Sequence, residues 1–214
     1  MLDAAGIDPA LWPEVVASTD VLGPLTPSAA RELGLSTSVL VVAGGGDGPM
    51  ANVAAASLAP EDAGYVCLGT SAWYATTTTA PIADPAQRGF TYRHIVPGLF
   101  APCATTQAGG DHELRPVSVI GGGANSDAWL QVFADLWGVP VQRRAATTEA
   151  TALGAATTGL VGLGEADFTI ARTLAPVTAT FQPRSDFTDR GLFRERYMAL
   201  YAALEPWFAT PEEA

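Results

Sequence analysis

The sequence predicts an α/β fold, and three observations lead to that prediction. In the second half of the chain, short apolar runs alternate with segments whose apolar residues recur at helical spacing. Paired, hairpin-like runs come before them. Three of the apolar runs end in glycine-rich turns. Strands that alternate with helices are typical of a sheet covered by helices, in which ligands bind beyond the carboxyl ends of the strands.

Residues 1–38 are expected to be a linker with short helices, leading into a domain over residues 39–214. One of these helices has clear signals, because Thr26 stands at the N-cap, Pro27 at the first helical position and Gly34 at the end. The elements expected next are a buried strand and a small-residue helix, over Val39–Ala43 and Pro49–Leu58.

The middle of the chain is expected to form strands, because its apolar runs are short, β-branched and aromatic. Pro97 and Gly98 separate two of these runs and indicate a hairpin. The expected strands are Tyr65–Leu68, Ala72–Thr79, Thr91–Val96, Leu99–Thr105 and Val117–Ile120.

The clearest helix is predicted over Asp127–Trp137. Ser126 can cap its first turn, and Gly138 ends it. Its apolar residues recur at helical spacing, so Trp129 and Trp137 are expected in the core. The remaining expected elements are a short strand, a helix and an amphipathic C-terminal stretch, over Val139–Gln142, Thr148–Leu160 and Asp189–Phe208.

Composition limits the kinds of ligand that the chain binds. Of its 214 residues 48% are hydrophobic and 15% charged, so we expect a folded core. The net charge is −11, which argues against nucleic acid and anionic membrane surfaces as partners. All 11 basic residues are arginines, and a P-loop is excluded because it needs a lysine. Phosphate must therefore be bound by backbone N–H groups, hydroxyls, arginine or a divalent cation.

The cysteines and histidines do not suggest a metal centre. Cys67 and Cys103 lie in apolar surroundings and are expected to be buried free thiols. His94 is interpreted as a strand residue without a catalytic role, and the adjacent Arg143 and Arg144 as a solvated edge. The start of the sequence lacks the pattern of a signal peptide, and no apolar stretch is long enough to span a bilayer. We therefore expect a cytoplasmic protein.

The three glycine turns are the best candidates for a functional site. The first contains Asp47, which is either a helix N-cap or a carboxylate base for a hydroxyl that attacks a phosphoryl group. The second, Gly69-Thr70-Ser71, is either an ordinary turn or a source of hydroxyls and free N–H groups. The third, over residues 121–126, precedes a capped helix, and neither it nor the first turn fits the dinucleotide fingerprint. Together the turns suggest a cleft that handles phosphate.

Taken in order, these segments resemble the C-terminal half of the FGGY carbohydrate kinases, most closely the xylulokinase branch. The matching stretches are Val42–Asp47, Leu68–Ser71, Thr106–Gly110, Ile120–Ser126 with Trp129, and Glu149–Ala156. The resemblance implies a ribonuclease-H-like domain of the actin-like ATPase fold, one half of a two-domain kinase with ATP and sugar in the cleft between the domains.

The resemblance also implies roles for individual residues. Asp47 corresponds to the base that deprotonates the sugar hydroxyl. The turn that faces the ATP phosphates corresponds to Gly69, Thr70 and Ser71, and a glycine near the nucleotide to Gly109. The adenosine-binding turn corresponds to Gly122, Gly123 and Ser126. The implied cofactors are ATP and Mg²⁺, and the implied ligands are a nucleotide and a small sugar.

Two departures from the family pattern qualify these expectations. The N-terminal half of the family, which supplies most sugar contacts, has no counterpart in the chain. The domain is also interrupted near residues 110–116, where Asp111–Pro116 is too short for the usual crossover helix. We therefore expect that one sheet face is exposed in the isolated chain, where a second copy or a missing N-terminal half could cover it. We also expect no sugar phosphorylation by the chain alone. The sugar is xylulose by branch, with ribulose, gluconate and glycerol left open.

A second interpretation is also carried forward from the sequence. The same turns suit a non-catalytic nucleotide-binding or interaction module derived from a sugar kinase.

Overall fold

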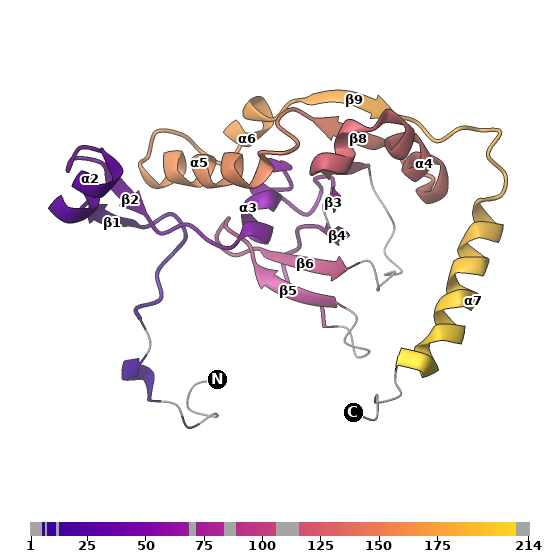
Figure 1. The fold of residues 1–214 in the computed structure, drawn as a ribbon, viewed down its shortest axis with the longest axis horizontal. Coiled ribbons are helices and arrows are strands. Elements are labelled where there is room, and N and C mark those ends of the chain that lie inside the picture. Colours follow the sequence, from indigo (N-terminus) through magenta and orange to yellow (C-terminus); the bar gives the residue numbers. More distant parts are fainter. Residues whose placement is uncertain are drawn as a thin grey trace.

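The computed structural model describes residues 6, 8–11, 13–68, 72–83, 89–105 and 116–208. Its centre is a seven-stranded mixed sheet with the order β5-β6-β4-β3-β7-β8-β9 (Figure 1). The strands are β3 (Tyr65–Leu68), β4 (Ala72–Ala75), β5 (Gly89–Arg93), β6 (Phe100–Thr105), β7 (Val117–Ile120), β8 (Val141–Arg144) and β9 (Val177–Phe181). The predicted strands and the α/β character are therefore present.

The parallel part of the sheet determines where a site can form. The central strand β3 pairs in parallel with β7, and β7 pairs in parallel with β8. The carboxyl ends of these three strands consequently lie at the same edge. The second and third glycine turns follow β3 and β7, so both begin at this edge.

Helices pack on both faces of the sheet. The face that carries Tyr65 packs against α3 (Asp47–Ala54) and α5 (Ala150–Gly162). The face that carries Val66 packs against α4 (Asp127–Trp137). The predicted limits of α4 are confirmed, since Ser126 accepts the N–H of Trp129 and Gly138 adopts the left-handed conformation. Trp137 packs against the core, but the expectation for Trp129 is wrong, because this residue is 57% exposed.

Close packing of α3 against α5 depends on one glycine. A Cβ atom on Gly154 would lie 1.9 Å from the carbonyl oxygen of Met50, which is far inside van der Waals contact. The hydroxyl of Thr158 also contacts the sulfur of Met50, at 3.3 Å. The helices that support the site edge are therefore in direct backbone contact.

The N-terminal elements stand outside the central sheet. A two-stranded sheet joins β1 (Val21–Pro24) to β2 (Leu40–Val42), with α2 (Pro27–Leu33) between them and the short helix η1 (Pro9–Leu11) before them. The expectation of a buried strand here is wrong, because β2 is exposed or half-buried and belongs to the small sheet. The predicted caps of α2, Thr26 and Gly34, are confirmed. The boundary at residue 38 stays a prediction.

The C-terminal helix α7 (Arg190–Phe208) extends along one side of the molecule (Figure 1). The segment before it is fixed to α4 through Asp135, which pairs with Arg184 at 2.7 Å. Beyond that anchor, the apolar residues of α7 are largely exposed: Leu192, Phe193, Tyr197, Met198, Leu200 and Leu204. The short helix α6 (Ile170–Leu174) completes the described elements. None of the described helices is long and apolar enough to cross a membrane.

Candidate functional site

Asp47 begins helix α3 and is exposed. The N-cap position belongs to Gly46, so the interpretation of Asp47 as the N-cap is wrong. Its carboxylate instead accepts the N–H of Gly48 at 2.9 Å. A negative charge in the first turn is stabilised by the helix dipole. The carboxylate is therefore fixed at the helix N-terminus and remains accessible to a ligand.

Two aromatic side chains, one buried and one half-buried, connect this turn to the sheet. The phenol of Tyr65 donates to the carbonyl of Gly48 at 3.0 Å, and the indole N–H of Trp73 donates to the Tyr65 oxygen at 3.2 Å. Tyr65 is completely buried. Two successive hydrogen bonds therefore connect Trp73 on β4, through Tyr65 on β3, to Gly48, the residue that follows Asp47.

The pKa shifts around β3 agree with this placement of Asp47. Burial raises the pKa of the Tyr65 phenol, and the nearby Cys103, Cys67 and Asp47 raise it further, against a smaller lowering by the Trp73 bond. Burial and the charge of Asp47 also raise the pKa of the Cys67 thiol. Burial raises the pKa of Cys103 to about 11. Both cysteines are free thiols, as expected, but the expectation of burial is confirmed only for Cys103, because Cys67 is half-buried.

The third glycine turn packs against the end of β3. Gly121 has φ +85°, and a Cβ atom there would lie 2.6 Å from the carbonyl oxygen of Leu68, the last residue of β3. A Cβ atom on Gly123 would lie 2.7 Å from the Leu68 Cβ. Only glycine permits this approach. The residues predicted in the second turn, Gly69, Thr70 and Ser71, lie outside the described residues, as does Gly109.

The third turn presents backbone donors. It forms a short 3₁₀ helix, η2 (Gly122–Asn125), in which Ala124 donates back to the Gly121 carbonyl at 3.0 Å. Within the described part of the chain, the N–H groups of Gly122 and Gly123 have no acceptor. Gly122 is exposed, whereas the Ser126 hydroxyl is engaged as the cap of α4. The turn can therefore offer N–H groups to an anionic or polar ligand.

Of two adjacent arginines on β8, Arg143 contacts this turn and Arg144 contacts the strand that precedes it. Arg143 donates to the Asp127 carboxylate at 2.7 Å and to the carbonyl of Ala124 at 3.5 Å. Arg144 donates to the hydroxyl of Ser118 and to the carbonyl of Ala175. The interpretation of the two arginines as a solvated edge is wrong, because both are half-buried and hydrogen-bonded.

His94 directly follows β5, so the expectation of a strand residue is wrong, and its lack of a catalytic role stays a prediction. Its Nδ1 accepts the N–H of Val96 at 2.9 Å, so its Nε2 carries the proton that is donated to the carbonyl of Ser57. Burial lowers the pKa of this imidazole. Among the described residues, no group of three His, Cys, Asp or Glu side chains could hold a metal ion.

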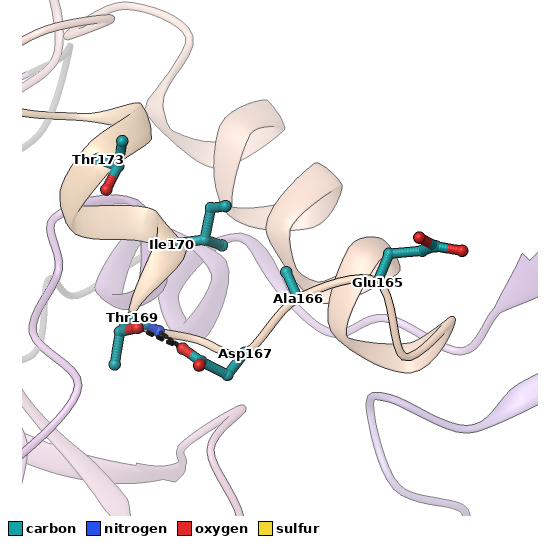
Figure 2. Close-up of a pocket in the computed structure, with 6 residues that line it drawn as sticks. All are labelled: Glu165, Ala166, Asp167, Thr169, Ile170 and Thr173. Carbon is teal, nitrogen blue, oxygen red and sulfur yellow. Dashed lines mark hydrogen bonds between the residues drawn. The ribbon is translucent and has the colours of Figure 1, made fainter.

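A hollow of about 280 Å³ lies elsewhere, at the connection between α5 and α6 (Figure 2). Its lining residues are Glu165, Ala166, Asp167, Thr169, Ile170 and Thr173. Asp167 accepts hydrogen bonds from the N–H and the hydroxyl of Thr169, so its carboxylate closes a local turn. None of the predicted site residues lines this hollow, and the candidate site is the edge where the third glycine turn packs against the end of β3.

Comparison with known proteins tests the resemblance at this point. Residues 89–163 match the C-terminal domain of the FGGY family of carbohydrate kinases. The resemblance to the FGGY carbohydrate kinases is therefore confirmed. The chain is 34% identical over 112 residues to the xylulose kinase of Lactococcus lactis, an alignment that covers 51% of the chain and 21% of that kinase.

The FGGY fold is confirmed by solved structures. A ligand-bound xylulose kinase from Lactobacillus acidophilus matches 95% of the chain with a TM-score of 0.82 and 15% identity. Plasmodium falciparum glycerol kinase with ADP matches 94% with a TM-score of 0.72 and 11% identity. At such identities the likeness concerns the fold alone, which is the predicted actin-like ATPase fold. The chain spans 60% and 57% of the lengths of these two structures. The predicted lack of a crossover helix concerns residues outside those described.

Proposed function

We propose that the chain supplies the nucleotide side and the catalytic base for ATP-dependent phosphorylation of a sugar hydroxyl, in the manner of a xylulose kinase. The observation that supports the proposal best is the placement of Asp47. Its exposed carboxylate lies in the first turn of α3, which the hydrogen bond from Tyr65 to Gly48 attaches to β3, and the last residue of β3 packs against the third glycine turn. The proposed base and the proposed N–H donors are therefore both attached to β3.

In the proposed reaction, Asp47 takes the proton of the sugar hydroxyl while the hydroxyl oxygen attacks the terminal phosphorus of ATP, and ADP leaves. The N–H groups of Gly122 and Gly123 are proposed to bind the adenosine part of the nucleotide, beside Ser126. The proposed phosphate contacts of Gly69, Thr70 and Ser71, and that of Gly109 with the nucleotide, rest on the resemblance.

The described residues fit a nucleotide better than an independently bound metal. Free backbone donors at a glycine turn suit ATP, whereas the described carboxylates, cysteines and histidines form no cluster of three. Mg²⁺ would therefore arrive with the phosphates and keep most of its water ligands, as it commonly does. There it would neutralise charge that develops on the transferred group.

The sugar is proposed to be xylulose, because the matching relatives include xylulose kinases. Ribulose, gluconate and glycerol stay open, and a glycerol kinase shares the fold. Phosphoryl transfer depends on positioning both substrates, so one wall of the cleft is not expected to suffice. A cytoplasmic location stays a prediction.

Calorimetry with ATP and Mg²⁺ tests the nucleotide side, and binding at millimolar nucleotide or tighter is expected. Absence of heat there would remove the nucleotide-binding claim. A coupled ATP and xylulose assay on the pure chain tests the catalytic expectation, with turnover at background. Turnover well above background that Asp47→Asn abolishes would show that the chain is active alone.

A non-catalytic interaction module is the second candidate, and one observation favours it. The large apolar side chains of α7 that the structure describes are 40–58% exposed, which is unusual for an amphipathic helix in a folded protein. A second copy or a separate N-terminal half would bury them. Light scattering on the pure chain tests the first of these partners, because a clean monomer would exclude self-pairing.

A further inference from the structure

One residue contacts both ends of the third glycine turn. Thr147 lies in the loop between β8 and α5 and is only 8% exposed. Its carbonyl accepts the N–H of Gly121 at 2.8 Å. Its hydroxyl donates to the side-chain oxygen of Asn125 at 3.1 Å. A single buried threonine thus connects residues on either side of Gly122 and Gly123.

The backbone just before this threonine is strained. Ala146 has φ +55°, in the left-handed region that residues with a Cβ rarely adopt. Strain of this kind persists only where the surrounding structure holds it, and it gathers at functional sites. Here the strained residue is exposed, so core packing does not explain it. The residue that follows it is Thr147, whose carbonyl and hydroxyl both contact the turn.

We propose that Thr147 is a positioning residue for nucleotide binding, which rests on the proposed function. Thr147 does not touch the ligand. It holds Gly121 and Asn125 at a fixed separation, so that the N–H groups of Gly122 and Gly123 between them, which have no acceptor among the described residues, converge on one ligand. Without the hydroxyl contact, a smaller fraction of molecules would have the turn in the binding conformation. The apparent affinity for the nucleotide falls in proportion to that fraction.

The test uses the full chain, with ATP and Mg²⁺ as the titrant in calorimetry. Thr147→Val keeps the shape of the side chain and the backbone bond but removes the hydroxyl. We expect about fivefold weaker ATP binding, the usual order for one lost hydrogen bond. Thr147→Ser keeps the hydroxyl and should restore the affinity to within about twofold of the original chain.

Thr157→Val is the matched control. Thr157 is also fully buried, but its hydroxyl has no hydrogen-bond partner among the described residues, so its loss should leave ATP affinity unchanged. If Thr147→Val fails to fold, Asn125→Ala removes the same contact from its exposed end and should weaken binding to the same extent. The double variant should be no weaker than either single variant, because both remove one interaction.

The outcomes separate this inference from the function on which it rests. Thr147→Val or Asn125→Ala with unchanged affinity, in a chain that binds ATP, overturns the positioning role alone. A change in unfolding midpoint without a change in affinity overturns it as well, since the contact would then only stabilise the fold. No ATP binding by the original chain overturns both the nucleotide function and the inference.

Discussion

The hydroxyl of Tyr65 donates a 3.0 Å hydrogen bond to the carbonyl of Gly48, and this contact attaches the first turn of α3 to the central strand β3. The strand that precedes Asp47 in sequence, β2, belongs to the separate two-stranded sheet. Sequence order alone therefore does not bring Asp47 to the edge of the seven-stranded sheet. The hydrogen bond from the buried Tyr65 instead attaches the turn that contains Asp47 to β3.

Replacing Tyr65 with phenylalanine should destabilise the chain. The variant loses the bond to Gly48 and leaves the indole N–H of Trp73 without its acceptor. The lost bond of the buried Tyr65 and the unpaired, half-buried indole N–H should together lower the free energy of unfolding in urea by about 2 kcal/mol. Tyr92→Phe is the control, because Tyr92 is 45% exposed, and it should stay within about 0.5 kcal/mol. Equal effects of the two variants would contradict the assigned role.

Local patterns in the sequence predicted the elements best where the signals are themselves local. The predicted limits of β3, β7 and α4 are those of the structure, because β-branched runs and paired caps are read within a few residues. The strand β9 was not predicted. Its Val177–Phe181 run is short and mostly exposed at the sheet edge, so it lacks a buried face to reveal it.

Errors arose where burial depends on distant partners. The apolar run of β2 looked buried, yet nothing in it indicates that it pairs only with β1. Arg143 and Arg144 looked solvated, but alternation along β8 sends one to α4 and the other to Ser118. The candidate site divides in the same way. Short glycine motifs in the sequence mark Asp47, Gly122 and Gly123. The contacts of Tyr65 and Thr147 join residues at least 17 positions apart, so no local pattern indicates them.

Gly154→Ala should be severely destabilising. The added methyl would lie 1.9 Å from the Met50 carbonyl oxygen, so α5 and α3 would have to separate. Overpacking usually costs about 1–3 kcal/mol. Because the clash is with a backbone atom, the free energy of unfolding in urea should fall by at least about 3 kcal/mol. Gly159→Ala lies on the same helix with nothing within 4 Å of the new Cβ. It should be neutral or stabilising by up to about 1 kcal/mol, because alanine favours helix. A Gly154→Ala variant as stable as Gly159→Ala would contradict the close packing.

Ala146→Gly should stabilise the chain. Alanine at φ +55° carries a steric penalty of about 1–2 kcal/mol that glycine avoids, while glycine costs somewhat more unfolded-state entropy. The net gain should be about 0.5–1 kcal/mol, or an increase of roughly 1–4 °C in Tm for a chain of this size. Ala145→Gly serves as the comparison, since Ala145 is not among the positive-φ residues, and it should lower Tm. A lower Tm for Ala146→Gly would show that the loop is not strained.

As the pH falls, protonation of His94 should destabilise the folded chain before the carboxylates of the protein begin to titrate. Burial holds the pKa of this imidazole below its ordinary value of 6.5 in the folded state, while the unfolded state keeps the ordinary value. Between those two values the unfolded chain binds more protons, so stability rises with pH. The contribution is complete above pH 6.5 and is lost as the pH falls through 6.5 toward the folded pKa.

Urea unfolding between pH 7.5 and 5.5 measures this effect, with a slope of at most about 1.4 kcal/mol per pH unit for one proton. His94→Asn should remove the slope, whereas His112→Asn, which changes the other histidine, should retain it. The carboxylates contribute at lower pH. Burial raises the pKa of Asp135, but the hydrogen bonds from Arg184 and Gln131 lower it by more, so its stabilisation is lost only in stronger acid. The expectation rests on the neutral imidazole of His94, which is hydrogen-bonded to Ser57 and Val96. A slope that survives in His94→Asn would contradict it and assign the acid sensitivity to another group.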